Sequence, residues 1–339
     1  ELLAHVLTSP AAPDAFVYQW RLGRDFRRRL KEWQLSLPYS VVQSLDKPRY
    51  FVDLQVETKP GHMLVGESTI QGRYDYTFAF LTHYCHPGQA NDGLSGVATG
   101  IEVMKRLRQK FPTPQYTYQL LIGPEMLGSV AYLTSHESRI DSYLGAVFLE
   151  MVGIRSPLRL GYTRRGNTYL DRVMKNVLLK RGAPFAECDF AEHWGNDEVI
   201  FDSVGAGVPG AALERHPFRW YHTSQDNMKE TDETSLEETV QILLDIIGVI
   251  ESDFIPRQRQ RVPIYLTRYG QYADWENDRS RYDTNAAIIS MMQGGISVFD
   301  IAKKINQPFS QVRDYVMRFV EHDLVEALPL TPDYFRRSV

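Results

Sequence analysis

Two imidazoles and a carboxylate lie close together in the sequence, at His83, His86 and Asp92. The apolar run at residues 76–81 predicts a buried strand before them, and the helical spacing of apolar residues at 97–107 predicts a helix after them. The three side chains therefore follow the carboxyl end of a strand, which is where open α/β sheets bind their ligands. Because nitrogen and oxygen donors at such an edge suit zinc, this segment predicts a metal site.

Each of three further expected strands is followed by an acidic or imidazole residue. These strands are expected at residues 119–123, 145–149 and 209–213, and the residues that follow them are Glu125, Glu150 and His222. Because the carboxyl ends of parallel strands meet at one edge of a sheet, we expect these residues to converge with Asp92 on a single cation. One such residue alone would usually lie on the surface, but their repetition at successive strand ends is hard to obtain by chance.

The order of apolar patterns along the chain predicts the fold class. Strands and helices alternate from residue 76 to about residue 250, with amphipathic helices expected at residues 169–180 and 236–250. This alternation is typical of an α/β protein with a mostly parallel mixed sheet flanked by helices. Period-two alternation also predicts strands at residues 50–56 and 63–70.

A change in composition near Pro256 predicts how the chain divides. We expect an N-terminal segment that belongs with the α/β domain at residues 1–64, the core of that domain at 65–256, a linker at 257–284 and a winged-helix domain at 285–339. Within the last part, helices are expected at residues 285–292, 298–304 and 311–322, and a short wing strand at 323–328.

The helix expected at residues 311–322 carries Arg313 and Arg318, but also Asp314 and Glu321. A helix that reads DNA should be more basic than this. We therefore expect the winged-helix domain to contact protein, either within the chain or in a homo-oligomer. Nucleic-acid binding is the less favoured alternative.

Composition and charge narrow the class of protein. The 339 residues are 43% apolar and 24% charged, and the formal net charge of −4 indicates no general affinity for nucleic acid or membrane. No apolar run reaches the roughly 18 residues of a membrane span, and the start Glu1-Leu-Leu-Ala-His lacks the basic leader of a signal peptide. Only Cys85 and Cys188 occur, which argues against a disulfide framework and favours the cytoplasm.

Four segments together resemble the zinc aminopeptidase family, which includes bacterial leucyl aminopeptidases and whose fold glutaminyl cyclases share. They are Asn91-Asp92-Gly-Leu-Ser-Gly-Val-Ala, Pro124-Glu125-Met-Leu-Gly-Ser129, Leu149-Glu150-Met-Val-Gly153 and Tyr221-His222-Thr-Ser-Gln-Asp226. The likeness covers residues 65–252 and implies a zinc exopeptidase-like fold. The segments Thr82-His83-Tyr-Cys-His86-Pro and Gly195-Asn-Asp197-Glu198, together with the winged helix, are similar to an aminopeptidase-like branch of the family.

The resemblance implies a zinc site with one or two ions. Asp92 would bind one metal or bridge two, and His83 lies where the family places the first histidine ligand. Glu150 matches the acidic residue that completes the site of the same metal, and His222 would bind on the other side. Because the loop before Asp92 is short, His86 is an alternative ligand to His83.

The resemblance also implies that Glu125 is the general base, but the sequence departs from the family nearby. Cys85 stands where the family has a carboxylate that orients the first histidine. The family's pair of glutamates is reduced to Glu125, so a second metal would lose one carboxylate ligand. Either Asp197 or Glu198 replaces it, or the site holds a single zinc.

These residues together predict a zinc-dependent, aminopeptidase-like hydrolase. A zinc-bound water has a pKa of about 7, and Glu125 would take its proton. The substrate would be a peptide with a free N-terminal residue, or a small peptide or amide. The residues predicted to bind it are Asp197, Glu198, Tyr221 and Asp226. For Asp226 a turn cap, for Tyr221 core packing, and for Asp197 and Glu198 an ordinary turn are the structural alternatives.

Three other functions remain open at this point. The same fold could support an N-deacylase or a cyclising transferase that acts on a specialised small molecule. A non-enzymatic binding protein with a degenerate metal site is the second alternative. A DNA-binding regulator is the third, and it depends only on the predicted winged helix.

Overall fold

The computed structural model describes residues 2–18, 33–57, 59–193 and 195–338. The chain divides into two compact units. The first comprises residues 1–244 and 335–339, and the second comprises residues 245–334.

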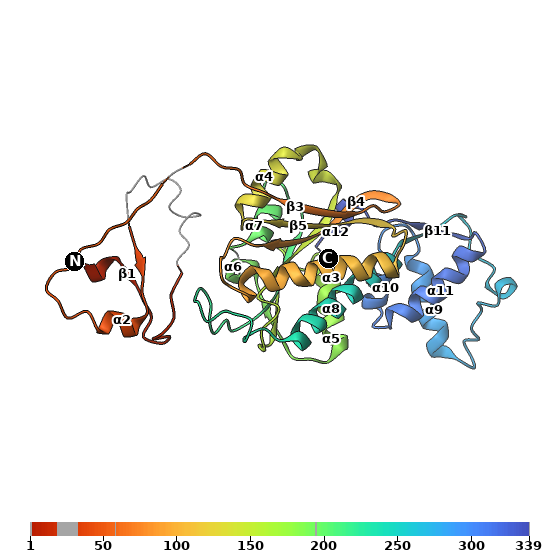
Figure 1. The fold of residues 1–339 in the computed structure, drawn as a ribbon. Helices are drawn as coiled ribbons and strands as arrows, with labels where there is room; N and C mark the ends of the chain where they lie inside the picture. Colours follow the sequence, from red (N-terminus) through yellow and green to blue (C-terminus); the bar gives the residue numbers. More distant parts are fainter. Residues whose placement is uncertain (1, 19–32, 58, 194, 339) are drawn as a thin grey trace. The chain divides into compact units, whose positions relative to one another are not determined.

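Among the described residues of the first unit, seven strands form one sheet in the order β3-β5-β4-β6-β9-β7-β8 (Figure 1). The strands are β3 (Gly66–Ile70), β4 (Tyr74–His83), β5 (Tyr116–Gly123), β6 (Tyr143–Glu150), β7 (Leu158–Gly161), β8 (Phe185–Cys188) and β9 (Gly210–Arg215). The pairs β5-β4, β4-β6, β6-β9 and β7-β8 are parallel, whereas β3-β5 and β7-β9 are antiparallel. The predicted fold class, a mostly parallel mixed sheet, is confirmed.

Helices cover both faces of this sheet. The helices are α3 (Gly96–Lys110), α4 (Leu127–Ser135), α5 (Tyr169–Arg181), α6 (Phe190–His193), α7 (Asp197–Phe201) and α8 (Glu233–Ser252). Leu133 of α4 and Phe201 of α7 share an apolar cluster with Leu81 of β4. On the opposite face, Leu120 of β5 lies so close to α3 that a Cβ at Gly100 would be 2.6 Å from its Cδ1. Among the described residues, no helix has the length and apolar character needed to cross a membrane.

The central strands are apolar along their length because helices cover both of their faces. All eight residues of β6 are buried. Polar residues that could do chemistry are found where these strands end: His83 is the last residue of β4, and Glu150 is the last residue of β6.

Among its described residues, the N-terminal part of the first unit contains short elements only. They are η1 (Leu2–His5), β1 (Val6–Leu7), β2 (Leu35–Ser36), which pairs in parallel with β1, and α2 (Tyr39–Gln43). An isolated antiparallel bridge joins Val17 to Thr223, and the backbone N–H of Tyr18 donates to the carbonyl of His222 at 2.7 Å. The N-terminal part therefore contacts the segment that carries His222.

The prediction of a strand at residues 50–56 is wrong. These residues have no regular secondary structure, and Phe51 and Val56 are 92% and 85% exposed. A period-two pattern becomes a strand only where a neighbouring strand completes its backbone hydrogen bonds, and the described part of the chain provides no such neighbour here. The strand predicted at residues 63–70 forms only from Gly66 onward, as β3.

The second unit is mainly helical. Its elements are β10 (Ile255–Gln258), η4 (Leu266–Tyr269), α9 (Arg279–Met291), α10 (Val298–Lys304), α11 (Phe309–Glu321) and β11 (Val325–Leu328), and α12 (Pro332–Arg336) follows. Met292, Ile301, Val316 and Phe319 are fully buried in its core. The predicted helices and the short strand are present, and β11 pairs with β10 in antiparallel fashion. The assignment of these elements as a winged helix stays a prediction.

Candidate metal centre

Five side chains predicted as metal ligands meet at the carboxyl edge of the central strands. His83 and Glu150 end the neighbouring strands β4 and β6. Asp92 lies in the turn that leads into α3, and His86 lies in the loop before that turn. His222 follows β9, which is the other neighbour of β6. The predicted convergence of residues that are distant in the sequence is therefore present in the structure.

One group of three donors consists of His83, Asp92 and Glu150. The Nε2 atom of His83 lies 3.2 Å from Oε2 of Glu150 and 3.5 Å from Oδ1 of Asp92. One ligand atom from each residue lies within 4.8 Å of the others, and all three side chains are buried. These three atoms can surround one cation.

A second group consists of His86, Asp92 and His222. The Nε2 atom of His222 lies 3.3 Å from Oδ2 of Asp92, and Nδ1 of His86 lies 3.7 Å from Oδ1 of the same carboxylate. The two imidazole rings are 5.0 Å apart between centroids. Asp92 therefore belongs to both groups, and the two histidines near it in sequence belong to different ones.

Cys85 lies between the two histidines of its own loop. Its Sγ is 3.9 Å from Nδ1 of His83 and 3.6 Å from Nδ1 of His86, and these three residues form a third group of donor atoms. The backbone N–H of Glu125 donates to the same sulfur at 3.2 Å. Cys85 thus contacts both histidines and also the segment that carries the predicted base.

The donors fit a divalent cation such as zinc. Imidazole nitrogen and carboxylate oxygen are ligands that zinc accepts. Oε1 of Glu150 is buried and has no hydrogen-bond partner in the part of the chain that the structure describes. A buried carboxylate oxygen without a partner is unfavourable unless a cation compensates it.

The protonation of these groups also favours a bound cation. Burial raises the pKa of Glu150 and that of Glu125. Burial works to lower the pKa of His83, but the Glu150 carboxylate, the hydrogen bond with Cys85 and the charge of Asp92 raise it well above its ordinary value. Without a cation the centre therefore retains protons, which a metal would displace because its ligands bind in the deprotonated form.

Gly93 allows Asp92 to approach His83. Its φ is 93°, and a Cβ at this position would lie 2.4 Å from the carbonyl oxygen and 2.6 Å from Nδ1 of His83. Gly93 lies in η2 (Asn91–Ser95), where the backbone leaves helical geometry at both Asp92 and Gly93. Only glycine combines this left-handed conformation with the absence of a side chain.

Three non-glycine residues around the centre also have positive φ. Met126 follows Glu125 and has a φ of 56°, Met151 follows Glu150 and has a φ of 47°, and His222 itself has a φ of 52°. Such conformations cost on the order of 1–3 kcal/mol each and persist where the surroundings fix them, often at functional sites.

Glu125, the predicted base, lies beside the second group of donors. Its Oε2 is 3.8 Å from Nε2 of His86, and its side chain is 19% exposed. The residue stands on the turn between β5 and α4. A carboxylate that is partly open to solvent and adjacent to the ligands suits a group that exchanges protons with a bound water.

The four residues predicted to bind substrate lie in different surroundings. Tyr221 is 50% exposed, and its ring stacks on His222 at 3.9 Å between centroids. Asp226 is buried and accepts hydrogen bonds from the backbone N–H groups of Asn91 and Asp92, so it fits its alternative, a turn cap.

The other two residues predicted to bind substrate, Asp197 and Glu198, are buried at the start of α7. The Ser129 hydroxyl donates to Asp197, and Nδ1 of His193 lies 3.9 Å from Glu198. Neither carboxylate belongs to a donor group found among the described residues, so the groups that contain Asp92 form without them.

Two residues that the sequence reasoning missed also take part. The side-chain amide of Asn196 donates to Oε2 of Glu150 at 3.4 Å, and the ring of Phe148 stacks on His83 at 5.9 Å between centroids. Phe148 could have been found, because an inward position two residues before a strand-end ligand lies on the same face. Asn196 offers no such pattern, since only the tertiary fold brings its loop to β6.

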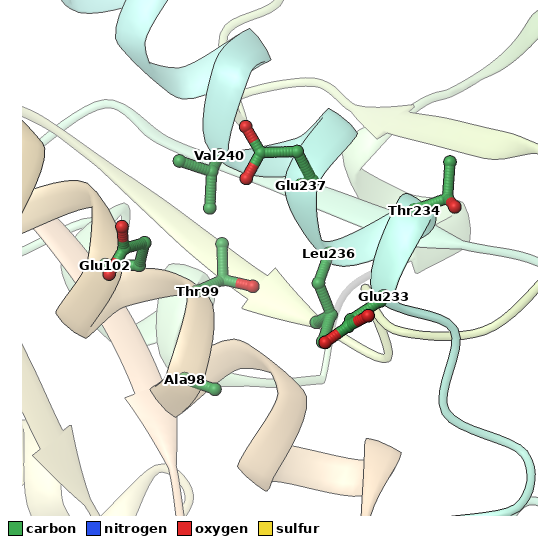
Figure 2. A pocket seen from close by; sticks show the side chains of 8 residues that line it. All are labelled: Ala98, Thr99, Glu102, Glu233, Thr234, Leu236, Glu237 and Val240. Atoms are coloured by element: carbon green, nitrogen blue, oxygen red, sulfur yellow. The ribbon is translucent and has the colours of Figure 1, made fainter.

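One hollow in the first unit lies between α3 and α8. Figure 2 shows side chains of α3, such as Thr99 and Glu102, opposite Leu236, Glu237 and Val240 of α8. Its volume is about 530 Å³, and it contains none of the five predicted ligands. A second recess, of about 380 Å³, is lined by residues next to the ligands, among them Met151, Trp220 and Asp226.

Two relatives match the chain over most of its length. A protein of Clostridium acetobutylicum named "putative polysaccharide biosynthesis protein with aminopeptidase-like domain" is 29% identical over 323 residues, which cover 92% of this chain and 71% of that protein. A crystal structure of a "putative peptidase" from Clostridium acetobutylicum is 24% identical, covers 96% of this chain and 74% of that chain, and has a TM-score of 0.78. This chain and the chain in that crystal structure share one fold.

More distant structures include BSAP, a zinc aminopeptidase from Bacillus subtilis. It is 20% identical, with 54% of this chain and 48% of that chain covered and a TM-score of 0.46. Zinc aminopeptidases and glutaminyl cyclases are thus among the similar structures, as the resemblance of the sequence implied.

The sheet topology and the strand-end residues define a protein with an aminopeptidase-like fold. The chain belongs to the family described as domain of unknown function DUF4910, whose model matches residues 13–253. This match includes all five predicted ligands and Glu125.

Proposed function

We propose that this protein is a metal-dependent hydrolase of the aminopeptidase-like class, which removes an N-terminal residue or cleaves a small peptide or amide. The observation that carries the proposal is the sharing of Asp92 between two groups of three donors, with Glu125 beside them. The name of the relative with an aminopeptidase-like domain supports the same class.

Zinc is the proposed cation, as one or two ions. His83, Asp92 and Glu150 would hold one ion, and His86, Asp92 and His222 would hold the other. Both histidines of the first loop are then ligands, but of different ions. In this arrangement the imidazole of His86 takes the place of the carboxylate that the sequence lacks.

A zinc ion with an open position lowers the pKa of a bound water to about 7 and polarises a carbonyl group. Glu125 would accept the proton of the attacking water and deliver it to the leaving amine. Burial raises the pKa of Glu125. A raised pKa helps this side chain to hold the proton between its removal from the water and its delivery to the amine. Asp226 would keep Asp92 in place through the backbone N–H groups of the turn.

The substrate would approach from the side of Tyr221. This residue is exposed, stacks on His222 and is close to the recess that Trp220 and Met151 line. Tyr221 is therefore the proposed substrate contact among the four predicted residues. The two free cysteines are consistent with the cytoplasm as the proposed compartment.

The test combines metal analysis with a substrate panel. Purified protein should contain zinc or take it up, and it should hydrolyse amino-acid anilides. The variant Glu125→Gln should retain its metal and lose hydrolysis, whereas Glu137→Gln, a change at an exposed residue, should leave both unchanged. A protein that binds no divalent metal would refute the proposal and support the non-enzymatic alternative. Cleavage of N-acylated amines alone would instead assign it as a deacylase.

A further inference from the structure

The turn that carries Glu125 is tight and strained. Its backbone N–H groups at Leu127 and Gly128 donate to Glu125 and Pro124 at 2.6 and 2.7 Å. Met126 within it has a φ of 56°. These local bonds give the turn its shape, and the backbone N–H of Glu125 links it to the donor groups by donating to Sγ of Cys85 at 3.2 Å.

Asp197 connects this turn to α7. Its side chain is 3% exposed, and the hydroxyl of Ser129, in the first turn of α4, donates a short hydrogen bond to its Oδ1. Burial raises the pKa of Asp197, and the Ser129 hydroxyl acts in the opposite direction by stabilising its ionised form. The carboxylate therefore faces the first turn of α4, where Ser129 lies.

The first turn of α4 has no other side-chain cap. Its N-cap position is Met126, whose side chain cannot accept a hydrogen bond from the free N–H groups of the helix. A carboxylate at a helix N-terminus compensates these groups and the positive end of the helix dipole. Asp197 supplies a carboxylate at this end from a different element, so α4 and α7 are held together at Ser129, in the helical turn that follows Glu125.

We propose that Asp197 is a positioning residue, which holds the turn of Glu125 against the metal centre rather than contacting substrate. This inference rests on the proposed function of Glu125 as the base. Loss of the Asp197 carboxylate should let the turn and the first turn of α4 relax, which displaces the base from the attacking water. A displacement of about 1 Å at a reacting group can cost on the order of 100-fold in rate.

The test compares variants of Asp197 with a matched buried carboxylate. Asp202, at the other end of α7, is 2% exposed and accepts from the backbone N–H groups of Arg164 and Gly210, away from Glu125. The variants are Asp197→Ala, Asp197→Asn, Ser129→Ala and Asp202→Ala. Each is measured for kcat and KM on an amino-acid anilide, for bound zinc, and for hydrogen exchange of the peptide covering residues 124–130.

We expect Asp197→Ala to lower kcat about 10- to 100-fold with KM and zinc content unchanged, and to speed exchange at residues 124–130. Asp197→Asn, which keeps an acceptor oxygen, should recover part of kcat, and Ser129→Ala should show a smaller loss. Asp202→Ala should affect stability without changing exchange in this peptide.

Normal exchange at residues 124–130 in Asp197→Ala would overturn the inference, as would an equal loss of kcat in Asp197→Ala and Asp202→Ala. A large rise in KM would also overturn it, because that result returns Asp197 to substrate binding. If the wild-type protein hydrolyses nothing, the proposed function fails, while the exchange measurement still decides whether Asp197 holds the turn.

Discussion

The backbone N–H of Asp92 donates a hydrogen bond of 2.8 Å to the buried carboxylate of Asp226. The same carboxylate accepts from the backbone and side-chain amides of Asn91 at 2.9 and 3.1 Å. Asp92, which both donor groups share, is therefore held through its backbone by Asp226, 134 positions further along the chain.

Removal of this support should weaken the whole centre. Asp226→Ala leaves several buried N–H groups without an acceptor, at a cost of about 1–3 kcal/mol in the free energy of unfolding. Asp226→Asn, which retains one oxygen, should cost less. Urea unfolding and zinc titration of both variants measure the effect, with the exposed Glu230→Gln as the control. Wild-type zinc affinity in Asp226→Ala would show that the turn holds Asp92 by itself.

The two donor groups predict separate losses of metal. Glu150→Gln should remove the ion held by His83, and His86→Gln should remove the ion held with His222, so that each variant binds one equivalent fewer than the wild type. Metal content after dialysis, together with the absorption spectrum of the cobalt-substituted protein, measures this. If the wild type binds a single equivalent and both variants abolish it, the centre holds one ion only.

Gly93→Ala should be more harmful than a change at an equally left-handed glycine. Gly166 has a φ of 61° and open space around its Cβ position, so Gly166→Ala adds backbone strain alone. At Gly93 the new methyl group would meet the backbone and the ring of His83. We expect an additional loss of about 1–3 kcal/mol, from overpacking, and reduced zinc binding. Equal stability losses for the two variants would contradict the close approach.

Zinc binding should release protons. Because burial raises the pKa of Glu150, and its acidic neighbours raise that of His83, these groups carry protons near neutral pH that the metal must displace. Affinity should therefore fall as the pH is lowered. Calorimetry in buffers with different ionisation enthalpies counts the protons, and Glu150→Gln should release fewer than the wild type. An unchanged proton count in that variant would place the displaced proton elsewhere.

The sequence was most informative where a single physical rule determines the position of a residue in the fold. His83 and Glu150 could be placed because apolar runs mark buried parallel strands, and parallel strands end at one edge. The helix at residues 298–304 was also predicted with the bounds that α10 has. In each case the pattern along the chain and the packing agree.

The sequence was less informative where the surroundings decide a role. Asp197 and Asp226 lie near motif residues in sequence, so they were predicted to bind substrate, yet both carboxylates serve backbone or hydroxyl groups. The assignment of His86 to a different donor group from His83 also depends on the path of the loop, which no periodicity encodes. The segment at residues 50–56 has the alternating pattern of a strand but forms none, because no partner strand lies beside it in the described part of the chain.

The contact of the N-terminal part with the His222 segment affects how short a working fragment can be. The backbone of Tyr18 and the bridge from Val17 to Thr223 hold the loop of a ligand that has an unfavourable φ. A truncated version that begins at the first strand of the large sheet would keep every ligand and Glu125, but its His222 loop would lose this tether. Engineering of a minimal version should therefore retain the residues just before position 18.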